Sequence, residues 1–243
     1  MKKIVSVLTI AIVCNTVGCK LLAQKYFAGT VKVEIKYEGD IDPQKHIPQE
    51  LEYTIFENKT KTTVYNGLVQ IMQDGDALTE TQLWDLSMFG FGRLGTAVDR
   101  EAMQNQLSKK KFSYEERSDT KTICGYVCKG YNVTVIAIEE DEEEDDDEDD
   151  ATEIKLLIYT TTEIGKDGNI NAFDYPGLSG FPMYSEFEKN DVKTIVQVKE
   201  VKKGKIKAVD FMIPSDYKMY DKEGFQKEME RIGEEMQKSK SNN

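Results

Sequence analysis

The sequence predicts a mainly β, α+β fold: one antiparallel sheet, strongly curved or barrel-like, followed by a C-terminal helix. Two observations predict it. Roughly ten short stretches between residues 27 and 211 alternate apolar and polar residues or are rich in β-branched and aromatic ones, with tight turns between them. A later stretch, Lys222 to Lys238, repeats apolar residues at steps of three and four, which is typical of one helix face.

The N-terminus has the pattern of a bacterial export signal. Two lysines precede an apolar run, Ile4 to Val13, which is shorter than the about 20 residues needed to cross a bilayer. Two processing routes are open: cleavage near Ala23, or lipidation of Cys19, which ends a lipobox-like Thr-Val-Gly-Cys. We therefore expect residues 1–24 to be a removed signal peptide.

The first predicted strands follow from period-two alternation. Residues 31–37 alternate apolar and polar side chains, and residues 51–55 alternate again. Asn66-Gly67 is a hairpin signal between two strand-like runs. Asp74-Gly75-Asp76 predicts the next turn.

The stretch from Leu83 to Gly95 has no clean period. We expect it to be a loop or short helix packed on the core, or a lid over a ligand cavity. In the second case the residues that line the cavity, together with inward side chains of the strands, would be Trp84, Leu86, Met88, Phe89 and Phe91. The polar stretch from Asp99 to Lys110 that follows is compatible with a helix.

Strand-like runs then flank an uninterrupted acidic segment. Cys128 to Ile138 and Ile154 to Thr160 enclose residues 139–150, which are all Asp or Glu. Twelve adjacent carboxylates repel one another, so we expect a solvated loop of an elaborated hairpin. Weak, unspecific binding of Ca²⁺ is the alternative, through acidic residues such as Glu139, Asp141, Glu143, Asp145, Asp147 and Asp149. No specific metal site and no cofactor are predicted.

Two cysteines remain outside the signal, Cys124 and Cys128. If residues 125–127 formed a tight hairpin loop, the two would face each other, and a disulfide would be feasible in an oxidising compartment. Two ordinary buried thiols are the alternative. His46 is the single histidine, so a histidine-based catalytic unit or metal site is not indicated.

The composition excludes several classes of function. The chain has a formal net charge of −12, and the first 24 residues hold three lysines and no acid, so export takes the net charge to −15. Such a chain is a poor partner for nucleic acid, whose phosphates dominate binding. The sequence shows neither a phosphate-binding loop nor a catalytic motif, so we do not expect an enzyme.

Several motifs together resemble a family of exported domains of unknown function from Gram-negative envelopes, which is similar to the LolA/LolB lipoprotein carriers. The motifs span most of residues 26–220 and are Phe27-x-Gly29-Thr30-Val31, Tyr37-Glu38-Gly39, Thr120-Lys121-Thr122-Ile123-x-Gly125-Tyr126-x-Cys128-Lys129, Gly177-Leu178-x-Gly180-Phe181-Pro182, Val198-x-Glu200-Val201 and Phe211-x-Ile213-Pro214-Ser215-Asp216-Tyr217. The resemblance implies a half-open β-barrel around an apolar cavity, with a few helices as a lid, and no catalytic residues. The acidic run and the C-terminal helix depart from the family pattern.

These observations lead to one set of expectations. The mature chain would be a single β-rich domain, residues 25–220, followed by an amphipathic helix and tail, residues 221–243. It would act in the periplasm, at the outer membrane or outside the cell, and its ligand would be a lipid or a lipoprotein acyl chain. The alternative is a structural or interaction protein that uses the C-terminal helix for an envelope partner. A membrane contact is expected only through a lipid on Cys19.

Overall fold

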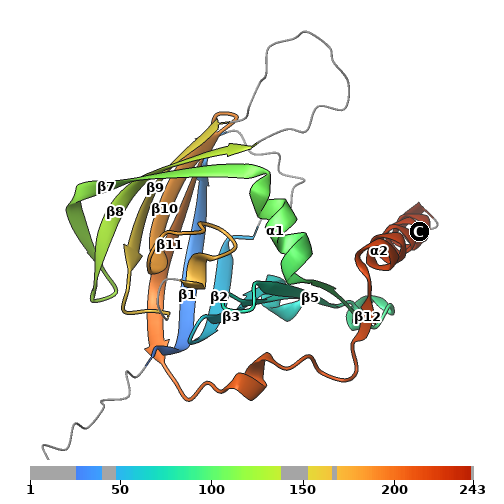
Figure 1. The fold of residues 1–243 in the computed structure, drawn as a ribbon. Helices are drawn as coiled ribbons and strands as arrows, with labels where there is room; N and C mark the ends of the chain where they lie inside the picture. The colour runs from blue at the N-terminus through green and yellow to red at the C-terminus, as the bar shows by residue number, and fades with distance from the viewer. Residues whose placement is uncertain (1–25, 40–47, 138–152, 166–168, 242–243) are drawn as a thin grey trace, which may run out of the picture.

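The computed structural model describes residues 26–39, 48–137, 153–165 and 169–241. Its strands and α-helices, shown in Figure 1, are β1 (Ala28–Glu38), β2 (Glu50–Phe56), β3 (Lys59–Val64), β4 (Val69–Asp74), β5 (Thr79–Asp85), β6 (Arg93–Val98), α1 (Arg100–Ser108), β7 (Lys110–Ile123), β8 (Tyr126–Ala137), β9 (Glu153–Thr161), β10 (Phe181–Lys189), β11 (Val192–Lys203), β12 (Lys218–Tyr220) and α2 (Lys222–Ser241). Short 3-10 turns are η1 (Tyr65–Gly67), η2 (Ser87–Phe89), η3 (Asn169–Asn171) and η4 (Ala208–Phe211).

The strands form one curved sheet, in the order β12-β6-β5-β4-β3-β2-β1-β11-β10-β9-β8-β7. All neighbours are antiparallel except β12, which runs parallel to β6. The two edge strands, β12 and β7, do not pair with each other, so the sheet is an open half-barrel (Figure 1). The predicted fold class is confirmed, with the addition of one parallel edge strand.

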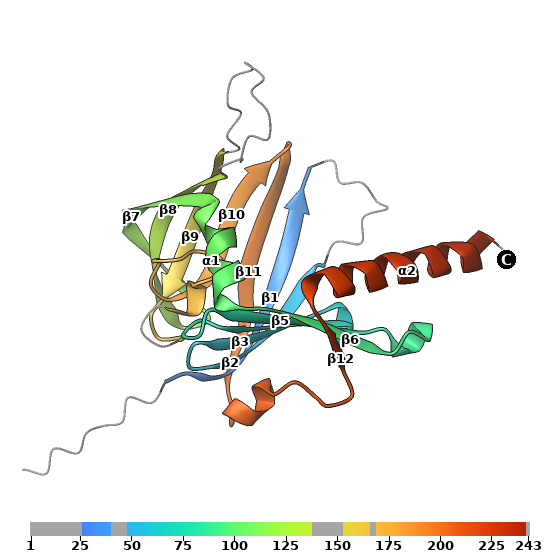
Figure 2. The ribbon, with the colours of Figure 1, turned by 45° about the vertical axis from the view of Figure 1, so that its right-hand side comes forward.

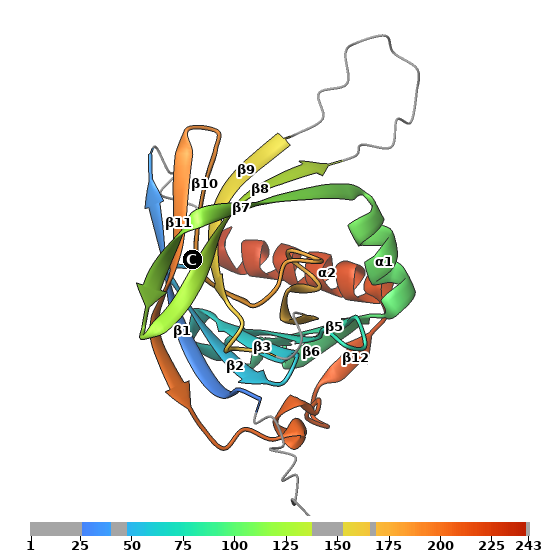
Figure 3. The ribbon, with the colours of Figure 1, turned by 60° about the vertical axis from the view of Figure 1, so that its left-hand side comes forward.

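Irregular strand pairing bends the sheet at three register shifts. The register shifts between Lys32 and Val33 in β1, between Pro182 and Tyr184 in β10, and between Glu116 and Thr120 in β7. An extra residue in one strand of a pair bends that strand and increases its twist. Since these shifts lie on strands near the middle and at one edge of the sheet, they help to give it the concave face seen in Figure 3.

The turns form where the sequence places them. Asn66 and Gly67 have positive φ values of 56° and 93° and connect β3 to β4, whose pairing ends at Val64 and Val69. The acidic run connects β8 to β9, which are antiparallel neighbours. The predicted elaborated hairpin is therefore confirmed, although residues 139–150 themselves lie outside the described residues.

Both predicted helices are confirmed. The Asp99 side chain caps α1 by accepting a hydrogen bond of 2.9 Å from the backbone N–H of Ala102. Helix α1 connects β6, near one edge, to β7 at the other edge (Figure 1). Helix α2 lies over the β6 and β12 end of the sheet, as Figure 2 shows.

The expectation of a loop or short helix over Leu83 to Gly95 is confirmed for residues 86–92, which contain the 3-10 turn η2, and is wrong for the two ends, which are strands. The segment is the β5–β6 hairpin, with the single turn η2 at its tip. Leu83 and Trp84 point to opposite faces, and both faces are covered: Trp84 packs against α2, while Leu83 lies beside Gly95, which the Met219 side chain also approaches. A strand covered on both faces loses its apolar–polar alternation, which is why its period is not visible in the sequence.

Candidate functional site

A cavity of about 190 Å³ lies on the concave face, between the middle of the sheet and the segment 170–175. Apolar side chains of four neighbouring strands form most of its wall. They are Val33, Ile35, Leu51, Tyr53, Phe181, Met183, Phe187, Val196 and Val198. Because its wall is mostly apolar, this cavity is the candidate ligand site.

Strand register brings these side chains together. Val33 of β1 pairs with Val198 of β11 on one side and with Leu51 of β2 on the other, and Ile35 pairs with Val196. Directly opposed residues in a sheet point to the same face. The alternation seen in residues 31–37 therefore becomes one continuous apolar surface across three strands.

The segment 169–180 closes the cavity on the side away from the sheet. The Asn171 side chain donates hydrogen bonds to the backbone oxygens of Leu178, at 3.1 Å, and Gly180. The Tyr114 hydroxyl donates to the Pro176 oxygen at 2.9 Å, and the Thr160 hydroxyl donates to the Ser179 oxygen at 2.8 Å. These bonds hold the segment against the sheet in the position seen in Figure 3.

One end of the cavity is polar. The Gln73 side-chain N–H donates to the Glu80 carboxylate at 2.8 Å and its oxygen accepts from the Thr60 hydroxyl at 3.3 Å. Asp174 lines the same end. Asp174 is exposed as a residue, but partial loss of water around its carboxyl raises the pKa of that group, and the nearby Glu80 charge adds to this rise. The cavity thus joins an apolar wall to an end that carries carboxyl groups.

Two half-buried tyrosines, Tyr53 and Tyr175, also line the cavity. Burial raises the pKa of both Tyr53 and Tyr175, and Asp174 adds to each shift. Tyr53 contacts Phe181 edge to face, with ring centroids 5.5 Å apart. The hydroxyls stay protonated at neutral pH, so these residues offer apolar rings and neutral donors to a ligand.

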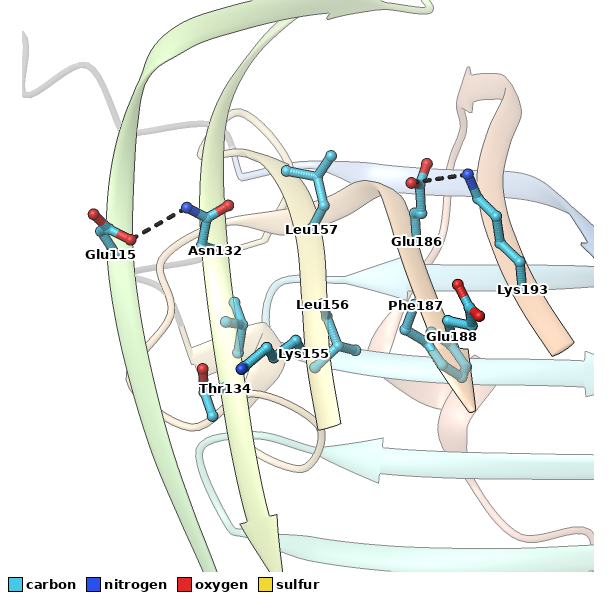
Figure 4. A pocket seen from close by; sticks show the side chains of 11 residues that line it. Glu115, Asn132, Thr134, Lys155, Leu156, Leu157, Glu186, Phe187, Glu188 and Lys193 are labelled. Carbon is cyan, nitrogen blue, oxygen red and sulfur yellow. Dashed lines mark hydrogen bonds and ion pairs between the residues drawn. The ribbon is translucent and has the colours of Figure 1, made fainter. Parts of the chain in front are cut away.

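A larger hollow, about 510 Å³, lies over β7 to β11 on the opposite face (Figure 4). Its lining is mostly polar or charged. Glu186 binds Lys193 at 3.0 Å, and the Asn132 amide donates to Glu115 at 3.2 Å. A hydrogen bond from Tyr184 and the Lys193 charge lower the pKa of Glu186. These contacts are those of a solvated surface, so we do not assign the ligand site here.

The five residues predicted to line a cavity lie elsewhere. Trp84, Leu86 and Phe91 pack together against α2, in a cluster with Leu94 and Ile232. Met88 and Phe89 are exposed at the β5–β6 tip, and Met88 keeps 79% of its surface. None of the five lines the concave cavity. Alternation does mark the inward residues of β1 and β2, but no local signal in the sequence shows that residues 169–180 fold back over them.

The cysteine pair is placed differently from the expectation. Ile123 pairs with Tyr126, so the hairpin loop is Cys124-Gly125 rather than residues 125–127, and Cys128 faces Lys121. Both are free thiols: Cys124 is exposed and Cys128 is buried. Burial raises the pKa of the Cys128 thiol, which keeps it protonated. The disulfide stays a prediction that this register does not favour.

Other predicted sites lie outside the described residues. These are Cys19 and the acidic run that could bind cations. Among the residues that the structure does describe, no cluster of three metal-ligating side chains is present. Within the same ranges, no helix has the length and apolarity needed to span a membrane.

Comparison with known proteins finds similarity in structure alone. No family model and no curated protein matches the chain. One similar solved structure is the lipoprotein LppX of Mycobacterium tuberculosis, with 10% identity and a TM-score of 0.28 over 72% of this chain and 86% of that one. Another is a LolA superfamily protein, NE2245, of Nitrosomonas europaea, with 10% identity and a TM-score of 0.31 over 77% of this chain and 90% of that one. A third is LprF of Mycobacterium bovis, with 7% identity and a TM-score of 0.27 over 72% of this chain and 85% of that one. The matches thus include the superfamily that the sequence motifs resemble. TM-scores of this size transfer neither a ligand nor a partner to this chain.

Proposed function

We propose that this chain is a non-enzymatic protein of the cell envelope that binds a hydrophobic ligand in the concave cavity. The observation that carries the proposal is the apolar wall formed by Val33, Ile35, Val196 and Val198 and closed by the segment 169–180. A soluble domain gains stability by filling such a space with its own side chains. An apolar hollow left at the centre of the sheet is therefore suited to an apolar guest.

The size of the cavity limits the guest. A cavity of about 150 Å³ is large enough for benzene, whereas pockets for drug-sized ligands have about 300–1,000 Å³. The 190 Å³ present here would hold a small apolar group or one end of an acyl chain. A longer chain would require the segment 169–180 to move, which breaks the bonds made by Tyr114 and Thr160.

The proposal also covers where in the cell the protein acts. Residues 1–24 would direct export and be removed, either near Ala23 or by lipidation of Cys19. Residues 25–220 would then act as one ligand-binding domain in the periplasm, at the outer membrane or outside the cell. A lipid or a lipoprotein acyl chain is the ligand class that fits an apolar cavity in that compartment.

A structural or interaction role is the second candidate. Its support is the β5–β6 tip, where Met88 and Phe89 are exposed side by side. An envelope partner could contact this tip directly. A partner that used the apolar stripe of α2 would first have to displace that helix from Trp84 and Leu94, because the stripe already packs there.

The test measures uptake of an apolar guest by the chain that lacks its first 24 residues. Titration with N-phenyl-1-naphthylamine, whose emission rises in apolar surroundings, should show saturable binding. Ser185→Leu adds volume to the cavity wall and should weaken binding at least tenfold. Phe187→Ala, which enlarges the cavity instead, should retain binding.

The control is Met88→Ser with Phe89→Ser, which should bind like the parent chain because neither residue lines the cavity. Native mass spectrometry and lipid extraction of protein from its own envelope fraction would identify the natural guest. A lipid-free mass together with no uptake of the probe would overturn the proposal. Loss of binding in the Met88 and Phe89 variant alone would instead assign the guest to the β5–β6 tip.

A further inference from the structure

The end of β11 and the connection that follows it to β12, residues 202–217, form an exposed surface that is both basic and apolar. Its basic side chains are Lys202, Lys203, Lys205 and Lys207. Lys202 is paired with Glu200 at 2.8 Å. Among the described residues, the other three have no acidic partner within ion-pair distance, and all three are exposed. They form a local excess of positive charge in a chain whose net charge is −12.

Apolar side chains stand beside these lysines. Val209 keeps 57% of its surface and Met212 keeps 67%, and Ile213 is also exposed. The turn η4 fixes them: the Asp210 carboxylate accepts from the Lys207 backbone N–H at 2.8 Å, and the Met212 N–H donates to the Val209 oxygen at 3.1 Å. The Lys61 ammonium donates to the Asp210 backbone oxygen at 3.1 Å, which holds η4 on β3.

The surface lies on the side of the sheet away from α1 and α2, as Figures 1 and 2 show. It is also where the described fold begins. The Gly204 N–H donates to the Ala28 oxygen at 2.9 Å, and Gly29 pairs with Lys203. Strand β1 therefore begins next to the lysines.

We propose that residues 203–213 are a docking surface for an anionic lipid bilayer. Lysines attract anionic headgroups, and exposed Val and Met side chains can enter the boundary between headgroups and acyl chains. Because β1 begins beside these lysines, a lipid on Cys19 would place this surface within a few residues of the membrane. A single lipid anchor binds reversibly, and a basic patch is the kind of second contact that makes anchoring stable.

This surface is separate from the concave cavity, so the inference does not rest on ligand binding. The experiment is a flotation assay with the chain without residues 1–24, which has no lipid of its own. The vesicles are phosphatidylcholine with or without 30% phosphatidylglycerol. The salt is on the order of 50 mM, at which electrostatic attraction is only weakly screened. Binding should require the anionic lipid and should fall as salt rises.

Three variants locate the contact. Lys203→Gln with Lys205→Gln and Lys207→Gln should weaken binding roughly a hundredfold, at about fivefold per lysine near an anionic surface. Val209→Ser with Met212→Ser tests the apolar part and should also weaken binding. The matched control neutralises three exposed lysines of other elements, Lys155, Lys189 and Lys222, and should bind almost as the parent chain does.

All variants are compared by thermal unfolding, since each changes exposed side chains only and should melt with the parent chain. No binding of the parent chain to anionic vesicles would overturn the inference, as would equal losses in the test and control lysine variants. Equal binding to vesicles with and without phosphatidylglycerol would also overturn it, because the lysines would then have no role.

Discussion

Ile232 of α2 offers a direct test of how the C-terminal helix is held. Its side chain retains only 2% of its surface, between Leu86 of the β5–β6 hairpin and Leu94 of β6. Around it, Trp84 and Phe225 approach with ring centroids 6.4 Å apart. Ile232→Ala removes the most buried apolar group of this contact.

The magnitude follows from burial. Truncation of a buried Ile to Ala costs about 2–5 kcal/mol, depending on how far the site can collapse. The other apolar residues of α2 are only half-buried, so the site can relax, and we expect about 2–3 kcal/mol. Helix α2 contacts mainly β6 and β12 at one edge of the sheet, so this loss should destabilise docking of the helix rather than the whole fold.

Hydrogen exchange measures docking directly. Protection of the backbone amides of residues 222–241 should fall roughly 30- to 150-fold in Ile232→Ala, the equivalent of about 2–3 kcal/mol. Protection at Val31 in β1 should not change. The matched control is Gln226→Ala on the exposed face of α2, which should change stability by less than about 0.5 kcal/mol.

Two outcomes would refute this reasoning. Amides of α2 that already exchange in the parent chain as fast as in an unstructured peptide would mean that the helix is not docked in solution. An equal loss of protection in α2 and in β1 would mean that α2 unfolds only together with the sheet. In that case residues 221–243 would be part of the domain rather than an appendage.

Three further predictions concern the sheet and its titrating groups. Gly29→Ala should destabilise the protein by about 1–3 kcal/mol in denaturant unfolding, because the added Cβ would lie 2.1 Å from the Lys202 oxygen. The control is Gly204→Ala, which should be nearly neutral because the nearest atom to its added Cβ is 3.9 Å away. Equal effects of the two variants would contradict the β1–β11 register. Folding raises the pKa of Asp174 above its ordinary 3.8, so the folded state holds this proton more tightly than the unfolded state. The free energy of unfolding should therefore fall as pH rises from 3.8 through the raised pKa. Because the residue is exposed, Asp174→Asn should remove this dependence and stabilise the protein only slightly at pH 7 in urea titrations. A less stable variant would show that the carboxylate is satisfied there. Hydrogen bonds from Arg117 and Tyr159, the latter at 2.5 Å, lower the pKa of Asp119 to about 2, so its contribution is present above pH 3.8 and is lost as pH falls from 3.8 towards 2. Tyr159→Phe should therefore begin acid unfolding at a higher pH, and an unchanged acid transition would argue against this bond.

Much of the fold could be predicted because its cause is local. The turn at Asn66-Gly67 forms since both residues adopt positive φ, and α1 begins where Asp99 can cap it. Each of these signals lies within a few residues of the structure that it specifies. The strand order is not local, yet repeated hairpins lead to an antiparallel sheet almost without alternatives.

The candidate site could not be predicted in the same way. Its wall depends on β1 lying between β2 and β11, and its cover depends on Asn171 turning the segment 169–180 back over that wall. The apolar residues around Trp84 are conspicuous in sequence, but α2 and the β5–β6 hairpin use them for packing. Exposed and buried apolar residues look alike until the partner that covers them is known.

The position of β1 also bears on when the protein can fold. Strands β2 to β6 and β7 to β11 are two series of neighbours in sequence, whereas β1 joins the first series to the second through its pairing with β11, near the other end of the chain. Contacts between distant residues form slowly, since the entropy of a long loop must be lost first. We therefore expect the two series of strands to join into one sheet only after β11 has been made, late in the synthesis of the chain.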